Sequence, residues 1–362
     1  QKKLVDLGWR GLTTTSPIII DGVEINIPLE TFTIDFEEKQ GRDAQFADQF
    51  SQDLKSNHHA ITVSSEQQFD SLGELINFMD EPMSDSAIVP TYMLSKTARE
   101  KGMKVLLSGA GGDEIFGGYP RHLPGKRFSA SWFSTLPQPT RSISAYLLGF
   151  LNRAHRIRFR KPSRNFAVNI SGVNFEFLSA ILRDSNEFSG LLSRIDCDFM
   201  NARAKNAYPL MELDLNNYLP NNVLSLTDKA TMATSVEGRV PLLDHRIVEF
   251  AFSLPEKTNL LDKEQKGLFK RTLSSRLPSD LLYRQKEGFN APIHRWVEKY
   301  PERIQSELLS STSSFLSDII DIRTIEKWIS SPVLRKQSGS TLYSLFVLNK
   351  WINTQHKNNN EF

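Results

Sequence analysis

The sequence predicts an α/β fold in which a parallel sheet is flanked by helices, followed by a largely helical second half. Three observations predict it. Strand-like and helix-like patterns alternate over residues 31–107, and helical spacing of apolar residues prevails from residue 211 onward. A glycine-rich segment directly follows an apolar strand, where a sheet of this class binds ligands beyond the carboxyl ends of its strands.

The first part of the chain contains connecting segments before the first clear strand. Residues 1–10 read as the end of an amphipathic helix. Residues 11–29 form a connection with a small hairpin over residues 18–27, whose tip is an Asp-Gly pair. Residues 31–36 then alternate between apolar and polar side chains, which predicts a strand.

Helices and strands continue to alternate beyond this strand. Apolar spacing predicts helices over residues 43–54, 67–79 and 91–101. Residues 58–63 read as a strand, and residues 80–86 form a polar loop with a proline break. The resulting order of elements predicts parallel pairing, because strands joined through helices lie parallel in one sheet.

The glycine-rich segment follows a short apolar strand at residues 104–107, which we expect to be buried. Residues 108–112 contain three glycines, and Asp113 and Glu114 follow where a helix can begin. Glycines let a phosphate approach the backbone, and free N–H groups at such a turn can face an anion. The acidic residue after them suggests a Mg²⁺ ligand. The alternative is a tight turn in which Asp113 caps a helix.

The second half of the chain reads as helical. The predicted helices lie at residues 142–160, 211–235, 247–251, 269–277, 296–310 and 342–351. Pro220 interrupts one of them, and the polar tail after Asn353 is expected to fray. The basic run at residues 153–164 is interpreted as a solvated helix end rather than as a site for an anionic partner.

The composition excludes several classes of protein. The 362 residues are 39% hydrophobic and 24% charged, so a sizeable core can form. A formal net charge of +2 gives no case for nucleic acid as a partner, and no apolar run is long enough to cross a membrane. The single cysteine, Cys197, excludes an internal disulfide framework and fits a reducing, cytoplasmic setting.

Three further segments carry more polar residues than a helical bundle needs, namely residues 80–92, 228–244 and 283–292. Basic side chains beside a phosphate-binding loop suit a pyrophosphate leaving group, because fixed cations stabilise the charge that develops on it. The alternative for each segment taken alone is a structural role, in which its Lys and Arg residues form ion pairs on the surface.

In combination, these segments resemble the synthetase domain of glutamine-hydrolysing asparagine synthetases. The segment Ser-Gly-Ala-Gly-Gly-Asp-Glu-Ile-Phe-Gly-Gly-Tyr, at residues 108–119, is similar to the second nucleotide motif of that family. The resemblance covers roughly residues 30–352. The other matching stretches are residues 31–36, 80–82, 85–86, 90–92, 232–244, 284–289 and 345–351.

The resemblance implies an adenylating ligase of the pyrophosphatase-loop type, with an adenine nucleotide hydrolase-like fold. In the family, the side-chain carboxylate of aspartate attacks the α-phosphate of Mg-ATP, which gives an aspartyl-adenylate and pyrophosphate. Ammonia from glutamine then displaces AMP. The implied product is asparagine, and the implied cofactors are ATP and Mg²⁺.

The family roles transfer by position to residues of this chain. Asp113 is implied to hold Mg²⁺, and Lys286 to contact the phosphates during adenylation. No role is assigned to Glu237 and Arg239. The alternative is that these two residues form a buried ion pair that only supports the structure. The implied nucleotide-site residues are Ile34, Ser108, Gly109, Gly111 and Gly112.

The chain also departs from the family pattern. Ala110 stands where many members carry an acidic residue, which favours a different carboxylate acceptor, such as a sugar acid in polysaccharide assembly. Lys229 replaces a commoner arginine. The first phosphate loop of the family and its amino-terminal glutaminase domain are absent from this sequence; we expect that they lay upstream and that this fragment alone is inactive. A catalytically dead nucleotide-binding homologue is the remaining alternative.

These observations predict one synthetase-type domain over residues 1–362. Residues 1–119 form a partial α/β nucleotide-binding core, and residues 120–362 form a mostly helical remainder that completes the site. The expected partners are a small-molecule carboxylate acceptor and ammonia from a glutaminase domain. No nucleic acid or membrane is expected, and a homodimer is left open.

Overall fold

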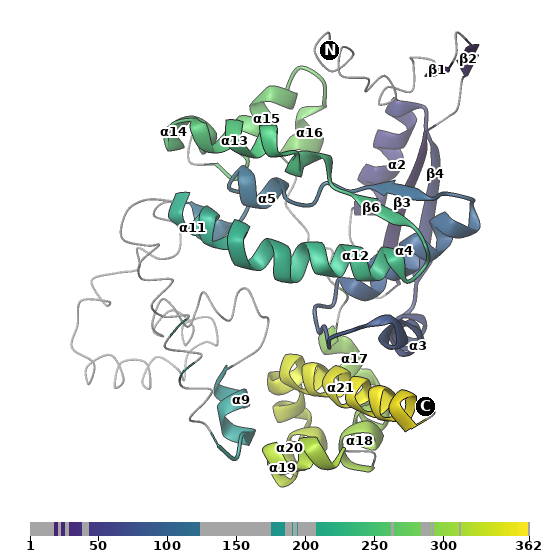
Figure 1. Cartoon of the computed structure of the whole chain (residues 1–362), viewed down its shortest axis with the longest axis vertical. Coiled ribbons are helices and arrows are strands. Elements are labelled where there is room, and N and C mark those ends of the chain that lie inside the picture. Colours follow the sequence, from purple (N-terminus) through teal and green to yellow (C-terminus); the bar gives the residue numbers. More distant parts are fainter. Residues whose placement is uncertain are drawn as a thin grey trace, which may run out of the picture.

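The computed structural model describes most of the chain outside its first residues and a long central segment (Figure 1). The described residues are 18–20, 23–25, 29–37, 43–123, 175–184, 190, 194, 208–261, 264–283, 291, 293–310 and 313–360. Four sequence predictions lie outside them: the helix end at residues 1–10, the helix at 142–160 with its basic run, the cysteine at 197, and Lys286.

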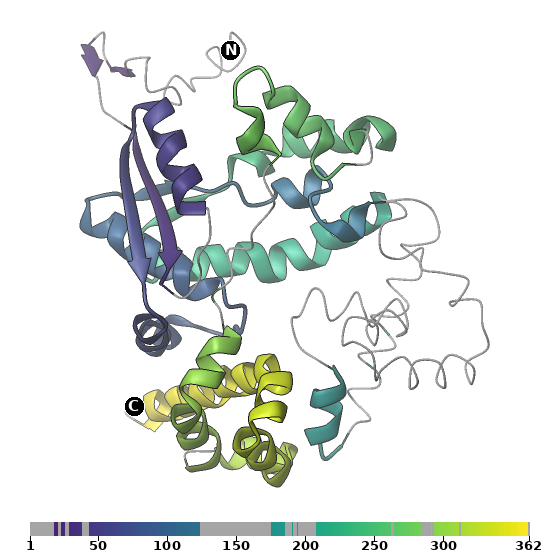
Figure 2. The ribbon, with the colours of Figure 1, turned by 180° about the vertical axis from the view of Figure 1, so that it is seen from behind.

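A β-α-β unit lies at one side of the molecule (Figures 1 and 2). Strands β3 (Glu30–Phe36) and β4 (Asn57–Val63) run parallel, and helix α2 (Asp43–Leu54) connects them. The inward side chains Ile34 and Phe36 are each 5% exposed, because they pack into the main hydrophobic core. The two predicted strands and the helix between them are confirmed.

The other described strands form two separate pairs. Strands β1 (Ile18–Ile20) and β2 (Val23–Ile25) pair antiparallel, which confirms the predicted hairpin. Strand β5 (Val105–Leu107) pairs parallel with β6 (Glu237–Arg239). The described strands therefore form two parallel pairs and a hairpin among many helices. This arrangement agrees with the α/β class, although one continuous sheet was expected.

The prediction that β5 is buried was wrong. Val105 is 38% exposed and Leu107 is 50% exposed. Helix α12 (Ser225–Met232) packs against the partner strand β6, but the described residues leave one face of this short pair open to solvent. An apolar run predicts a strand, whereas burial depends on which distant elements cover it.

Helix α4 (Ile88–Glu100) packs against strand β3, and α3 (Ser65–Leu75) packs against α4. Ser64 starts α3 with a capping box, in which Ser64 and Gln67 each bind the other's backbone N–H. Helix α4 begins three residues earlier than predicted, and Pro90 lies in its first turn. Proline is tolerated there because the first N–H groups of a helix have no intrahelical acceptor.

A continuous helical run leads from α11 (Tyr208–Leu213) through the π-helix η4 (Asp214–Leu224) into α12. This run confirms the helix predicted over residues 211–235. The predicted interruption is a wider π-helical stretch that contains Pro220. The run crosses the middle of the molecule in Figure 1 and separates the strand pairs from the carboxyl-terminal helices.

Short helices gather around the end of the glycine-rich segment (Figure 1). Helix α5 (Gly112–Ile115) packs against α13 (His245–Ser253) through a small apolar cluster that includes Ile115, Phe116 and Ala251. The neighbouring elements are η2 (Pro120–His122), η5 (Pro241–Leu243), α14 (Glu256–Asn259), α15 (Gly267–Leu273) and α16 (Ser279–Leu282).

The carboxyl-terminal helices form a bundle at the other end of the molecule (Figures 1 and 2). The long helix α21 (Pro332–Asn360) packs against α17 (Ile293–Lys299) and α20 (Ile322–Ser330). It continues beyond Asn353, so the prediction of a frayed tail was wrong. Among the described residues, no helix combines the length and apolar content that a membrane crossing requires. The other elements are α9 (Phe175–Ile181), α18 (Pro301–Gln305), η7 (Ser306–Ser310) and α19 (Ser314–Ile319).

Candidate functional site

The glycine-rich segment, called here the glycine loop (residues 108–118), begins at the carboxyl end of β5. The Ser108 N–H donates to the Arg239 carbonyl at 2.8 Å, which extends the parallel ladder by one bond into the loop. Strand β6 ends at the same edge, so residues that follow both strands meet there. The predicted passage from strand through glycines into a helix is confirmed.

Packing explains two of the predicted nucleotide-site glycines. Gly111 has a φ of 85°, and a Cβ built on it would lie 2.3 Å from Leu243. A Cβ on Gly112 would lie 2.9 Å from Leu242. The space beside these glycines is therefore filled by η5, so the absent side chains are required by the fold whatever the loop binds.

Gly109 differs from these two glycines. A Cβ built on it would meet no heavy atom within 4 Å, and the residue is exposed. Beside it, the Ala110 N–H donates to Ser108 Oγ at 3.2 Å, so the serine hydroxyl bends back over the turn. Ser108 and Gly109 thus form the part of the loop that a ligand could approach from solvent.

Asp113 does not cap a helix. Helix α5 begins at Gly112 after Gly111 as its N-cap, and no side chain caps it, so the tight-turn alternative with a capping Asp113 is wrong. Instead, Asp113 Oδ1 lies 3.2 Å from Lys266 Nζ, and the carboxylate side chain is 22% exposed. The Asp113 carbonyl accepts the Gly118 N–H at 2.7 Å, which folds the loop back on itself.

Lys266 was missed by sequence reasoning. It precedes α15 far along the chain, and no local pattern indicates that it would reach the glycine loop. The adjacent Gln265 donates from Nε2 to the Gly118 carbonyl at 2.6 Å and fixes this segment against the loop.

A buried polar cluster, consisting of Glu114, Tyr119, Arg121, His122 and Asp214, supports the loop from the protein side. Asp214 Oδ2 accepts from Arg121 Nε at 2.7 Å and lies 2.6 Å from His122 Nε2. The Arg121 guanidinium carbon lies 3.9 Å from the centre of the Tyr119 ring, whose hydroxyl donates to Glu114 at 2.7 Å. Nothing in the sequence pattern connects Asp214 to this turn.

Burial decides the pKa values in the cluster. It raises the pKa of Glu114, although the Tyr119 hydroxyl opposes the shift. It lowers the pKa of His122, although Asp214 favours the charged imidazole. His122 is therefore neutral near neutral pH, and Arg121 with Asp214 supplies the cluster's ion pair.

The structure corrects the interpretation of Ile34 and of the pair formed by Glu237 and Arg239. The side chain of Ile34 lies in the main core, so it cannot face a ligand directly. Glu237 and Arg239 do form an ion pair, at 2.9 Å, but both side chains are 57% exposed, so the buried-pair interpretation was wrong. The structure places them on the exposed strand pair at the same edge as the glycine loop.

Two of the three polar segments meet in space. Lys229 Nζ contacts the Asp80 carboxylate and lies 3.3 Å from Glu81. Asp85 accepts from the Asn222 side chain at 2.7 Å. The loop at residues 80–86 is thus tied to the helical run that leads to β6, whereas most of the third segment lies outside the described residues.

The residues present can supply part of a metal site. The described residues contain no group of three or more His, Cys, Asp or Glu side chains that could hold a metal ion. Mg²⁺ at a nucleotide site, however, commonly takes one or two protein carboxylates, and phosphates and water complete its coordination. The carboxylate of Asp113 is partly exposed and can serve as one such ligand.

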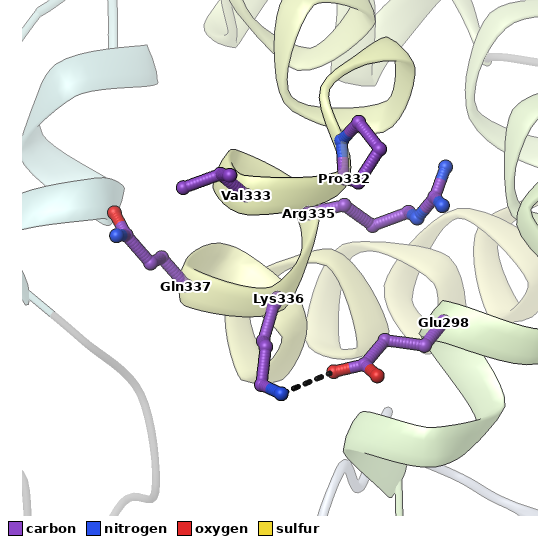
Figure 3. Close-up of a pocket in the computed structure, with 6 residues that line it drawn as sticks. All are labelled: Glu298, Pro332, Val333, Arg335, Lys336 and Gln337. Atoms are coloured by element: carbon purple, nitrogen blue, oxygen red, sulfur yellow. Dashed lines mark ion pairs between the residues drawn. The ribbon is translucent and has the colours of Figure 1, made fainter.

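A surface pocket of about 510 Å³ lies far from the glycine loop, at the start of α21 (Figure 3). Lys336 and Glu298 face each other across it at 3.9 Å, and Lys336 is 69% exposed. Such an exposed pair contributes little to binding or stability. The lining residues are Glu298, Pro332, Val333, Arg335, Lys336 and Gln337, none of which was a predicted site residue.

The fold defines an α/β protein whose glycine loop lies at the carboxyl end of a parallel strand pair, the place where sheets of this class bind ligands. Comparison with known families is more specific: the asparagine synthase family matches residues 22–353. The chain belongs to that family, as its sequence motifs predicted.

Curated relatives agree with this assignment. A putative glutamine-hydrolyzing asparagine synthetase of Mycobacterium tuberculosis is 28% identical over 313 residues, which cover 84% of this chain and 47% of the relative. Glutamine-hydrolyzing asparagine synthetase 1 of Bacillus subtilis is 25% identical over 293 residues, or 78% of this chain and 46% of the relative. The chain thus spans about half the length of these relatives.

Proposed function

We propose that this chain is the ATP-dependent, amide-forming part of an asparagine synthetase-type ligase, with the adenine nucleotide hydrolase-like fold of the family. The observation that carries the proposal is the family match over residues 22–353, whose second nucleotide motif forms a loop at the carboxyl end of a parallel strand. The reaction would join a carboxylate to ammonia after adenylation, with release of pyrophosphate. A reducing, cytoplasmic setting is part of the proposal.

Five of the predicted residues have a role in this proposal, whereas Gly111 and Gly112 shape the loop through their packing against η5. The half-buried Ser108 and the exposed Gly109 would contact the nucleotide. Ile34 would contribute through its backbone, because its side chain is in the core. Asp113 would hold Mg²⁺, which would neutralise phosphate charge during adenylation. Lys286 would contact the phosphates of the leaving group.

Aspartate is the first candidate acceptor, with ammonia derived from glutamine, because the relatives are named glutamine-hydrolyzing asparagine synthetases. A second candidate is another carboxylate, such as a sugar acid. It is favoured by Ala110, which brings no charge to the outer turn of the loop.

Pyrophosphate release from ATP tests the proposal. The full-length protein is supplied with ATP, ammonium and a panel of carboxylates, aspartate first. We expect release with only one class of acceptor, and Asp113→Ala and Lys286→Ala should each reduce it by a factor of about 100 or more. Asp48→Ala, an exposed carboxylate on α2, is the matched control and should leave the rate unchanged.

Two results would overturn parts of the proposal. Absence of release with every acceptor, despite ATP binding, would favour the catalytically dead nucleotide-binding homologue. An undiminished rate in Asp113→Ala would remove the metal role from that residue, and a normal rate in Lys286→Ala would move the phosphate contact to another cation.

A further inference from the structure

The carboxylate of Asp113 already has a cation beside it. Lys266 Nζ lies 3.2 Å from Asp113 Oδ1, and the two side chains are 28% and 22% exposed. A cation beside a half-buried carboxylate stabilises it, because opposite charges attract more strongly where water is partly excluded. The ammonium of Lys266 is that cation in the structure described here.

The ammonium is held in place by the fold. Lys266 itself has a φ of 56°, an uncommon left-handed conformation for a residue other than glycine. The Lys266 carbonyl accepts the Lys270 N–H at 2.8 Å, and Gln265 bonds the Gly118 carbonyl at 2.6 Å. The lysine side chain also crosses Gly118, since a Cβ there would lie 2.6 Å from Lys266 Cε.

We propose that Lys266 is the resting counter-ion of Asp113 and that a divalent cation must displace it to reach this carboxylate. The inference rests on the proposed function, in which Asp113 holds the metal. An ammonium and a divalent cation cannot share one carboxylate at close range without strong repulsion. Lys266 therefore lowers the metal affinity of the loop when no nucleotide is bound, and the loop binds metal well only together with phosphates.

A merely structural lysine gives the opposite expectation. If Lys266 only tied α15 to the loop, its removal would loosen Asp113 and weaken metal binding. If it competes with the metal, its removal strengthens metal binding. The sign of the change separates the two roles without any measurement of the reaction.

The test is a titration with Mn²⁺ alone, in which the free ion is followed by electron paramagnetic resonance. Lys266→Met, which keeps the length of the side chain but removes the charge, should bind Mn²⁺ about fivefold more tightly, as expected for a partly exposed ion pair. The control is Lys270→Met. Lys270 lies on α15, the helix that Lys266 precedes, and pairs with Glu264 at 2.6 Å, so its removal should change nothing at the loop. Lys266→Arg, which retains the charge, should also match the wild type.

Unchanged or weaker Mn²⁺ binding in Lys266→Met, with a thermal midpoint near that of the wild type, would overturn the inference. If Lys266→Met does not fold, Lys266→Gln replaces it under the same criterion. Equal Mn²⁺ binding by the wild type and Asp113→Asn would instead show that Asp113 holds no metal, and this would refute the metal role itself. Failure of pyrophosphate release while the Mn²⁺ results hold would refute only the proposed reaction.

Discussion

The glycine loop has two polar faces that differ in their access to water. On the protein side, Glu114 and His122 are each 1% exposed and Asp214 is fully buried. On the outer side, Gly109 is exposed, and Asp113 pairs with a lysine that is itself partly exposed. Buried polar groups must find their partners inside the protein, whereas groups near water can exchange a partner for a ligand.

This difference separates the residues that hold the loop from those that can act on a ligand. The Asp214 carboxylate joins η2 to the π-helix η4 and fixes the turn that follows Gly118. The side chain of Asp113 pairs outside that framework, with Lys266, and Gly109 has open space where a side chain would lie. We therefore expect substitutions on the buried face to change stability, and substitutions on the outer face to change ligand binding.

The largest expected effect is that of Asp214→Ala. It should lower the free energy of unfolding by about 3–5 kcal/mol, because it leaves the Arg121 guanidinium, which is 9% exposed, without this counter-ion. Asp113→Ala should cost about 1 kcal/mol or less, since its pair with Lys266 is partly solvated. Urea unfolding of both variants measures the contrast, and equal losses would contradict the distinction between the faces.

The next effect tests the packed side of the loop itself. Gly111→Ala should cost about 2–3 kcal/mol, because the new Cβ meets Leu243 and the positive φ strains an alanine. The double variant Gly111→Ala/Leu243→Ala should lose less stability than the two single losses added together, because truncation of Leu243 opens the space. Strict additivity in thermal unfolding would show that the clash is not the cause.

A smaller effect should appear in the pH dependence of stability. Burial holds the pKa of His122 below its ordinary value near 6.5, so below that pH the unfolded chain binds a proton that the folded protein does not. Stability should therefore fall as the pH decreases from 6.5, by up to about 1.4 kcal/mol per pH unit. His122→Gln, which can still donate to Asp214, should show a flatter profile in urea unfolding from pH 7 to 5.5. Parallel profiles would assign the acid sensitivity to other groups.

The parts of this site that the sequence predicted are those with a local signature. Three glycines after an apolar strand indicated the loop, and helical spacing indicated the run that contains Asp214. Strand β6 was missed, because its Glu-Gly-Arg sequence shows no apolar alternation and its identity comes from pairing with β5. The burial of β5 was predicted wrongly for a related reason, because burial of a strand depends on elements that are distant from it in the sequence.

Long-range contacts account for what could not be predicted. Lys266 reaches Asp113, and Asp214 reaches Arg121 and His122, across long stretches of chain. Charged residues are common on protein surfaces, so their type alone does not predict a partner. The family resemblance placed Asp113 and Gly109 in a nucleotide site, but it could not show that Gly109 is the glycine with open space around it.

The smallest expected change in stability is that of Gly109→Ala, and this variant tests directly whether the outer face of the loop binds a ligand. Its Cβ would meet no described atom within 4 Å, so the free energy of unfolding should change by about 0.5 kcal/mol or less, in contrast to Gly111→Ala. If the open side of the loop receives the nucleotide, the same methyl group should crowd it and weaken ATP binding about tenfold, within the usual cost of overpacking. Calorimetric titration with ATP, together with thermal unfolding of the free protein, measures both quantities on one variant. Unchanged ATP affinity would place the nucleotide elsewhere, and a large loss of stability would mean that the outer face, too, serves to hold the fold.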